Sequence, residues 1–297
     1  NKDISGFRNI TGTGNLTVDG GTVKLDGNYP VGTDNVALGN TALDSVEAGG
    51  INNVAIGDNA GTAITTGDHN TAVGKDALLS NTTASNNTAV GIESLMCNTT
   101  GTANLALGAY AMCKNTTANN NTAVGAAALL ANTTGANNTG VGKDSLIANT
   151  TGANNVAVGY LSLDANTTGA TNVAMGRGSL GANTTGSCNV AIGDLALVAA
   201  TTVSQNTAIG VLSMTATTSG IRNTAVGRQS MCANTTGCCN VAMGSNALAS
   251  GTTGDFNVAV GGAALGSVNT GNCNTAIGAC AMNTNTSGAN NTAVGKD

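Results

Sequence analysis

The sequence is poor in charge and in large side chains. Only 8% of its 297 residues are charged and 2% are aromatic, and it contains no Trp, one Pro and one His. These shortages do not indicate disorder, because disordered chains carry net charge and lack aliphatic residues. Here 41% of the residues are hydrophobic. The combination favours a repetitive β structure filled by small side chains.

The same shortages exclude several classes of function. The basic residues form no stripe, so we expect no nucleic-acid partner. No apolar run approaches the ~18 residues that span a bilayer, so we expect no membrane insertion. His69, the single His, is interpreted as an exposed turn residue, since one His gives a metal site or His-based catalysis little to build on. Asp144, Asp164 and Asp194 occupy different columns of the repeat described below, so we expect no paired carboxylates, no cofactor and no enzyme.

Cysteine is also too sparse to build a disulfide scaffold, with eight residues and no metal-ligand spacing. Cys97 and Cys113 lie one repeat apart in neighbouring columns, which makes them the candidate intrachain disulfide. The remaining cysteines are open to bonds between chains or to a role as small buried apolar residues: Cys188, Cys232, Cys238, Cys239, Cys273 and Cys280.

Glycine, in contrast, is abundant, and a 17-residue unit repeats from Asn53 to the end without insertion or deletion. A longer, degenerate unit begins at Asn35. The units are rich in Gly, Thr, Val and Asn, which are poor helix formers, and 17 residues suit a single β coil. We therefore predict an all-β fold, a parallel β-solenoid of 17-residue coils over residues 35–297, preceded by a short β adaptor over residues 1–34.

Residues at the same position of successive units form a column, and the positions are numbered 1 to 17 from the opening Asn. The residue types in each column lead to the following structural predictions. Position 5 is Gly in every unit, which predicts a turn with positive φ or a backbone too crowded for a Cβ atom. Its first eight members from Asn53 onward are Gly57, Gly74, Gly91, Gly108, Gly125, Gly142, Gly159 and Gly176. Charges concentrate at positions 6 and 7, which we place in an exposed turn. The Asn-Thr-Thr-Gly run at positions 12 to 15 is expected to form the second turn.

The unit Asn121–Asn137 illustrates which side chains we expect inside the coil. Positions 2 and 4 should share one face of a strand and the Ala at position 3 the other. We predict that Val124 and Leu129 point into the coil, with position 9 in a second short strand. Ala123 should face a neighbouring chain in an obligate oligomer. Ala126 and Ala127 should face solvent, and Gly135 should supply the conformation of the second turn.

Two further patterns lie in the second turn. Asn81, Asn98, Asn115 and Asn132 open Asn-Thr-Thr triplets that match the N-glycosylation pattern, although repeated turn chemistry is the preferred explanation. The Thr residues at positions 13 and 14 form two columns, which makes ice binding an alternative function.

The opening of the unit, as in Asn155-Val-Ala-Val-Gly159 and Asn189-Val-Ala-Ile-Gly193, resembles the head repeat of YadA-type trimeric autotransporter adhesins. That resemblance implies a left-handed parallel β-roll in a homotrimer, intertwined or side by side. The whole unit, with its Asn-Thr-Thr-Gly tail, is similar to the repeats of phage-type tail fibres, as is the segment from Asp3 to Val18.

These resemblances lead to three hypotheses of function. The first is a rigid trimeric rod in a virion tail fibre, which attaches to a host-cell receptor through a distal tip outside this chain. The second is the head of a bacterial surface adhesin that binds cells or matrix, and the third is an ice-binding solenoid. The first two place the protein on a virion or in an extracellular, cell-surface setting. Because the chain has no initiator Met and stops within a repeat, we expect it to be part of a longer polypeptide.

Overall fold

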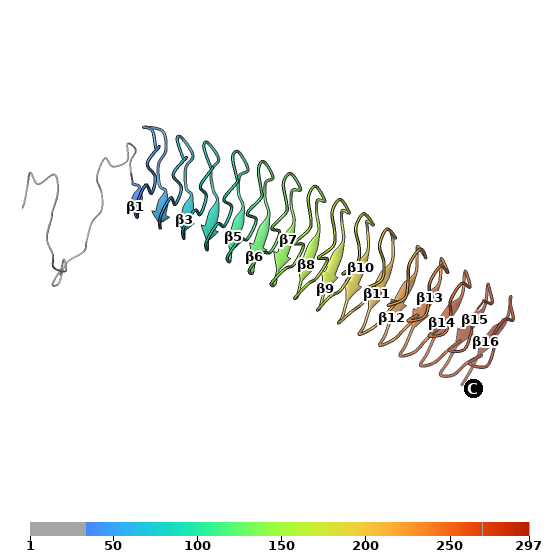
Figure 1. Ribbon diagram of the computed structural model, residues 1–297. Coiled ribbons are helices and arrows are strands. Elements are labelled where there is room, and N and C mark those ends of the chain that lie inside the picture. The colour runs from blue at the N-terminus through green and yellow to red at the C-terminus, as the bar shows by residue number, and fades with distance from the viewer. Residues whose placement is uncertain (1–33, 269, 297) are drawn as a thin grey trace, which may run out of the picture.

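A computed structural model describes residues 34–268 and 270–296, so the adaptor expected over residues 1–34 lies outside the described residues apart from Asp34. The described residues form a parallel β-solenoid with one short strand per coil, which confirms the predicted fold class (Figure 1). Each strand pairs with the next one along the chain. The strands are β1 (Val36–Leu38), β2 (Val54–Ile56), β3 (Thr71–Val73), β4 (Thr88–Val90), β5 (Leu105–Leu107), β6 (Thr122–Val124), β7 (Thr139–Val141), β8 (Val156–Val158), β9 (Val173–Met175), β10 (Val190–Ile192), β11 (Thr207–Ile209), β12 (Thr224–Val226), β13 (Val241–Met243), β14 (Val258–Val260), β15 (Thr275–Ile277) and β16 (Thr292–Val294).

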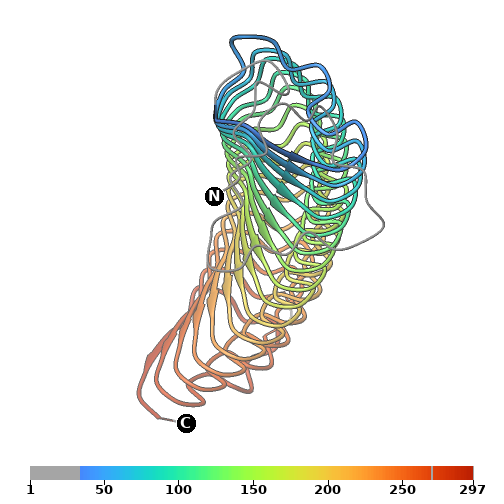
Figure 2. The same cartoon turned by 90° about the vertical axis from the view of Figure 1, so that its left-hand side faces the viewer.

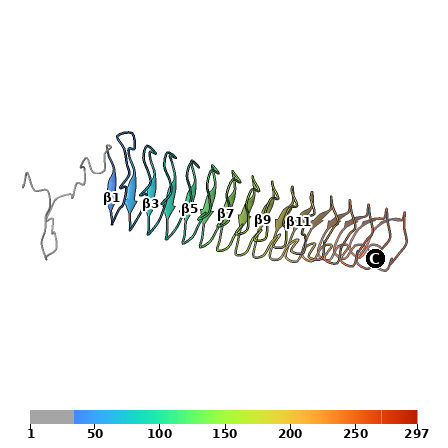
Figure 3. The same cartoon turned by 45° about the horizontal axis from the view of Figure 1, so that its top comes forward.

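The coils stack in register, so every column of the repeat lies on itself along the rod. In β8 and β9, for example, Val156 pairs with Val173 and Ala157 with Ala174. Outside the strands the backbone still bonds between coils, as when the Leu163 N–H donates to the Ser179 carbonyl at 3.0 Å. The strands consequently form one row along the rod, which turns gradually from the first coil to the last (Figures 1, 2 and 3).

The interior of each coil is narrow and is filled by few side chains. Leu129, at position 9, is fully buried, as predicted. Ala123, at position 3, is also fully buried, whereas Val124 at position 4 is only half-buried. Gly140 shows what position 3 faces, because a Cβ atom added there would lie 3.4 Å from Cγ of Leu129. The Ala column therefore packs against the Leu column inside the coil.

The predicted orientation of the strand was wrong. Positions 2 and 4 do share one face, but Val124 points outward, and Ala123 points inward and away from any neighbouring chain. The physical reason is space: with one Leu per coil already inside, only a methyl group fits on the opposite wall. The size of the side chains decides which face of the strand points inward, and an assignment based on hydrophobicity alone gives the wrong face.

The arc from position 6 to position 11 is a turn without a second strand. None of the described position-9 residues lies in a strand, so that part of the prediction was also wrong. Leu129 instead has a left-handed backbone with φ of 52°, as does Ala127 at position 7 with φ of 57°. Two such residues in three turn the chain sharply and direct the Leu side chain inward. Ala126 is exposed and Ala127 is half-buried, so solvent faces the first more than the second.

Glycine serves different purposes in the two turns. The eight position-5 glycines named above have φ between 127° and 141°, and a Cβ atom on Gly125 would lie 2.6 Å from the carbonyl carbon of Gly142. Gly135, at position 15, has no such φ, so the conformational role expected for it was wrong. A Cβ atom there would instead collide with the Gly152 carbonyl oxygen. Ala118 occupies the same column, so the requirement for Gly is weaker there.

Two columns of buried Asn hold the coils together. At position 1, the side-chain oxygen of each Asn accepts the backbone N–H of the Asn in the next coil, as Asn138 does from Asn155 at 2.9 Å. The Nδ2 of Asn155 donates to the Gly169 carbonyl at 2.8 Å and so closes its own coil. This position-1 ladder runs unbroken from Asn35 to Asn291.

The second column, the position-12 ladder, is continuous from Asn81 to Asn183 through side-chain amide bonds between successive coils. It stops where Ala200 replaces Asn, and the Asn183 side-chain oxygen is then buried without a hydrogen-bond partner. Thr217 occupies the same column in the coil after Ala200, and its buried hydroxyl has no hydrogen-bond partner either. The position-12 ladder thus ends at Asn183, because the next coils carry Ala200 and Thr217 in this column.

Candidate functional site

The strongest candidate for an interaction surface is the outer side of the strand row. We call the outward side chains at positions 2 and 4 of β1 to β16 the strand face. They are Val, Ile, Leu, Met or Thr in every strand, and none is charged. Sixteen strands at about 4.8 Å give a face about 70 Å long. Its side chains are half-buried or exposed, with Met243 46% exposed and Ile277 43% exposed.

A largely aliphatic face of this length differs from the two turns, which carry charged residues at positions 6 and 7 and Thr at positions 13 and 14. Large contiguous apolar patches on soluble proteins mark interaction sites, whereas scattered exposed apolar residues need no explanation. A strand of three residues spans about 10 Å, so the strand face covers on the order of 700 Å². That is close to the ~800 Å² per partner of a standard protein interface. The face is therefore large enough to hold a partner.

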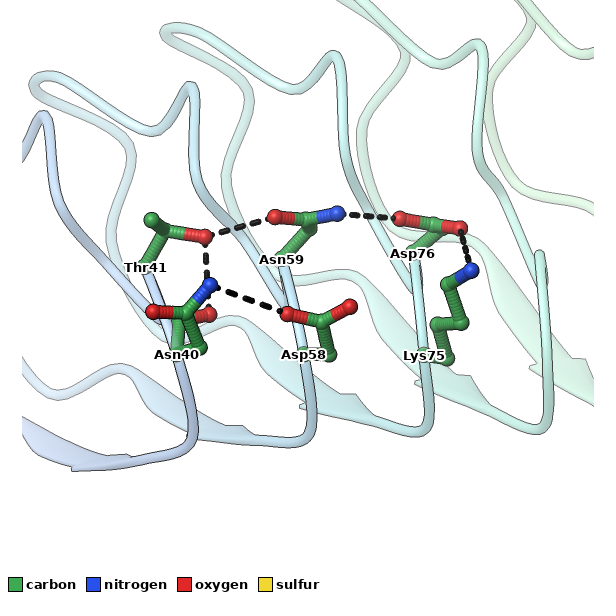
Figure 4. A network of polar contacts seen from close by, with 6 residues as sticks. All are labelled: Asn40, Thr41, Asp58, Asn59, Lys75 and Asp76. Atoms are coloured by element: carbon green, nitrogen blue, oxygen red, sulfur yellow. Dashed lines mark hydrogen bonds and ion pairs between the residues drawn. The ribbon is translucent and has the colours of Figure 1, made fainter.

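The turn at positions 6 and 7 presents the opposite chemistry. Near the start of the rod, Thr41 Oγ1 donates to Asn59 Oδ1 at 2.6 Å, and Asn59 Nδ2 donates to Asp76 Oδ1 at 2.8 Å. Lys75 Nζ lies 3.7 Å from Asp76 Oδ2. Figure 4 shows this line of polar contacts crossing successive coils. The contacts join the degenerate first coil to the regular coils that follow it.

Ion pairs extend the same polar edge further along. Arg177 and Asp194 form a two-pronged pair between successive coils, with contacts of 2.8 and 2.9 Å. The hydrogen bond from Arg177 lowers the pKa of the Asp194 carboxyl. Lys143 pairs with the adjacent Asp144 at 3.1 Å, and this hydrogen bond raises the pKa of Lys143. The cation of each pair is exposed to solvent, so the pairs contribute little to stability.

One carboxyl sits in an apolar column. Asp164 is at position 10, where neighbouring coils carry residues such as Ile147, and its burial raises the pKa of the carboxyl. The nearby charge of Asp144 adds to this rise. Asp194 pairs instead with Arg177, so only Asp144 and Asp164 of these three acids influence one another. Among the described residues there is no group of three or more His, Cys, Asp or Glu that could hold a metal ion.

The two cysteines of the candidate disulfide are brought together by the fold but are not bonded to each other. Both are free thiols, and the backbone N–H of Cys97 donates to the Cys113 carbonyl at 3.0 Å. Burial raises the pKa of the Cys113 thiol to about 11, with further contributions from Cys97 and Glu93. At neutral pH this thiol is protonated and unreactive.

The Asn residues of the glycosylation pattern lie inside the coil. Asn81, Asn98, Asn115 and Asn132 are fully buried members of the position-12 ladder. The Nδ2 of Asn98, for example, donates to Asn81 Oδ1 and to the Gly101 carbonyl, both at 2.9 Å. A glycan could therefore be attached to these nitrogens only before the coil forms. Glycosylation at these four positions stays a prediction.

The two Thr columns differ in what their hydroxyls do. At position 13 the hydroxyl donates to the carbonyl of the same position in the next coil, as Thr133 does to Thr150 at 3.0 Å. At position 14 the side chain is exposed, as in Thr134 and Thr151. A flat array for ordered water requires parallel ranks of free hydroxyls, and the fold leaves one such column per coil. This geometry weakens the ice-binding hypothesis.

The remaining surface features are few. His69 is exposed, and its Nε2 lies 3.4 Å from Asn52 Nδ2. A hollow of about 540 Å³ lies at the last coil and is lined by Met282 and Ala293, whose columns are buried elsewhere. It exists because no further described coil covers these two side chains. Within the described part of the chain, no helix has the length and apolar character needed to cross a membrane.

Comparison with protein-family models and with curated proteins finds no match to this chain. Its candidate functions must therefore be argued from the surface itself.

The strand face is the surface that the sequence reasoning missed, because positions 2 and 4 were assigned to the interior. A signal for the correct orientation was present. Position 3 is nearly always Ala, as a cramped interior requires, while position 4 ranges from Val to Met. Variation in size is typical of a side chain that points out of the coil.

Proposed function

We propose that this chain forms the rigid shaft of a homotrimeric fibre, with copies packed along their strand faces. The observation that carries the proposal is the strand face itself: an uncharged, outward, mostly aliphatic surface about 70 Å long that follows the whole rod. Exposing this surface to water is unfavourable, and association removes it from water. A threefold arrangement lets every copy bury its face against two equivalent partners around one axis.

The shaft would act mechanically. Its stiffness arises from the position-1 ladder and from the backbone bonds between coils, which connect each of β1 to β16 to the next strand along the rod. In a virion tail fibre such a shaft holds a distal tip, outside this chain, at a distance from the particle so that the tip can bind a host-cell receptor. The fibre would work on the virion surface.

The test of this proposal is the molar mass in solution. Light scattering of the purified chain should give three times the 28.6 kDa of one chain. Val124→Lys with Val158→Lys places two charges on the strand face and should convert the trimer to monomer. The matched control is Ala126→Lys, which adds a charge at an exposed position of the same coil and should leave the trimer intact. A monomeric wild-type chain at micromolar concentration would refute the proposal.

A second candidate is the head of a bacterial surface adhesin, in which the coil surface itself binds cells or matrix. Three exposed aromatic side chains on the turns favour it: Tyr110, Tyr160 and Phe256. Lys143 Nζ lies 5.7 Å from the centre of the Tyr160 ring. Direct binding of the rod to cells or matrix proteins, lost in Tyr160→Ala, would favour the adhesin over the shaft.

A further inference from the structure

The strand face carries a rhythm longer than one coil. At position 4, twelve of the sixteen strands have Val or Ile and the other four have Leu or Met. Those four are Leu38, Leu107, Met175 and Met243, in β1, β5, β9 and β13. They recur at intervals of four coils, or about 19 Å. All four project from the rod, with exposures of 47%, 44%, 41% and 46%.

Position 2 follows the same four-coil rhythm. Two strands with an aliphatic residue alternate with two that carry Thr, and the pattern holds in all strands except β6 and β8. In each strand that has Leu or Met at position 4, position 2 is aliphatic as well: Val36, Leu105, Val173 and Val241. The strand face therefore consists of prominent apolar bands about 19 Å apart, separated by flatter stretches that contain Thr.

This rhythm is a property of the outer face and not of the chain as a whole. Duplication of a four-coil block would have imposed the same period on the buried columns. At position 9, however, Leu fills five successive coils from Leu129 to Leu197, which is longer than one period. At position 7, residues four coils apart differ in most cases, as Ala127 does from Leu195 and Leu161 from Gln229. The period is thus tied to whatever contacts the strand face.

We propose that the four-coil rhythm fixes the axial register in which copies of this chain pack along their strand faces, parallel and without stagger. The inference rests on the self-association proposed above. A second copy is the natural occupant of the face because it necessarily carries the same 19 Å period. In the unstaggered arrangement, Leu and Met bands meet each other and Thr meets Thr.

Without the rhythm, copies of a uniform repeat could slide past one another in steps of one coil, since each coil resembles the next. A slip of two coils sets the bands against Thr and leaves buried hydroxyls facing alkyl groups without a hydrogen-bond partner, which is unfavourable. A slip of four coils restores the match but leaves four of the sixteen strands uncovered. The unstaggered register is therefore favoured over every slipped one. It matches the apolar bands of the copies, and the slipped registers either bury Thr hydroxyls against alkyl groups or leave strands uncovered.

The experiment moves three of the four Leu and Met residues of position 4 by two coils while conserving composition. The shifted variant combines Leu107→Val with Val141→Leu, Met175→Ile with Ile209→Met, and Met243→Ile with Ile277→Met. All six side chains point outward, so the interior of the coil is unchanged. Wild-type and shifted chains are given different affinity tags and co-expressed, and mixed oligomers are counted by native mass spectrometry.

We expect differently tagged wild-type chains to mix at random, and shifted chains likewise to mix among themselves. The abundance of oligomers that contain both wild-type and shifted chains should be at least tenfold lower than random mixing would give. Free mixing of the two would overturn the register proposal while leaving the trimeric shaft intact. A monomeric wild-type chain would instead overturn the shaft and, with it, the register.

A second measurement uses only the wild-type chain. An equal mixture of ¹⁴N- and ¹⁵N-labelled chains is refolded together and treated with an amine-reactive crosslinker, so that links between copies are identified by mass. Links between copies should join lysines of the same coil, such as Lys143 to Lys143. A link between Lys75 of one copy and Lys143 of another, which is an offset of four coils, or the absence of links between like lysines would overturn the unstaggered register.

Discussion

Asn155 offers a direct test of the position-1 ladder, because its side chain closes its own coil and joins it to the next one. It is fully buried in the middle of the rod. Its Nδ2 donates to the Gly169 carbonyl at 2.8 Å, and its Oδ1 accepts from the Asn172 backbone N–H at 3.0 Å and from Asn172 Nδ2 at 3.1 Å. Replacing it by Ala removes these three hydrogen bonds at once.

The three lost hydrogen bonds differ in their energetic cost. The Gly169 carbonyl keeps a second donor in Asn166, and Asn172 Nδ2 keeps its bond to the Gly186 carbonyl. The Asn172 N–H is left buried without a partner, which costs about 1–3 kcal/mol, and each of the other two bonds contributes about 0.5–1.5 kcal/mol. Asn155→Ala should therefore lower the free energy of unfolding by about 2–6 kcal/mol.

Asn155→Asp tests the two functions of the side chain separately, because it keeps the acceptor oxygen and removes the N–H donor. A carboxylate still accepts the Asn172 N–H, but it faces the Gly169 carbonyl without a proton to donate. Its protonated form restores that donor, so the folded state holds the proton more tightly and the folded pKa of the carboxyl lies above the unfolded one. The destabilisation should be full above the folded pKa and should shrink as the pH falls through it.

Chemical denaturation at equal protein concentration measures both variants, since association of copies would make stability depend on concentration. Hydrogen exchange should localise the loss of protection to the coils on either side of residue 155, because a solenoid coil contacts only its neighbours. Thr151→Ala, on an exposed side chain of the preceding coil, is the control and should change stability by less than about 0.5 kcal/mol. If Asn155→Ala were no more destabilising than this control, the ladder would not hold the coils together.

Three further predictions follow from single sites. Ala200→Asn, made together with Val203→Gly, extends the position-12 ladder by one coil and gives a donor to Asn183 Oδ1; because Val203→Gly alone loses a buried side chain, denaturation should show a gain of about 1–3 kcal/mol over that single variant, and an equal midpoint in the two variants would mean that the unpaired oxygen has no energetic effect. Asp164→Asn should raise the melting temperature at pH 7, because the raised pKa of this carboxyl penalises its charged form, and the gain should disappear at a pH below the unfolded pKa; a gain that persists in acid would point to packing instead. Cys113, whose pKa is raised to about 11, should react with iodoacetamide at pH 8 about 100-fold more slowly than the exposed Cys188, as followed by peptide mass mapping. If the peptides of Cys97 and Cys113 were instead found linked, with a combined mass lower by two hydrogens, the two residues would form a disulfide and not free thiols.

The period of the sequence was sufficient to predict the class of fold. Seventeen residues are enough for one small coil, and a column that repeats without insertion must stack on itself. The unbroken Gly at position 5 marked a crowded backbone, and Gly125 indeed leaves no room for a Cβ atom beside Gly142. The Asn that opens every unit stacks on itself for the same reason, and its side-chain oxygen accepts the backbone N–H of the next Asn.

Only the three-dimensional structure decided which side of the strand is inside. An alternating strand has two equivalent ways to face a core, and the larger residue, Val124, appears the better choice when burial is judged by hydrophobicity. The closed coil adds a limit on volume that no single strand reveals. Once the left-handed turn brings Leu129 inside, the space opposite holds the methyl group of Ala123 and nothing larger, so Val124 and the whole strand face are turned outward.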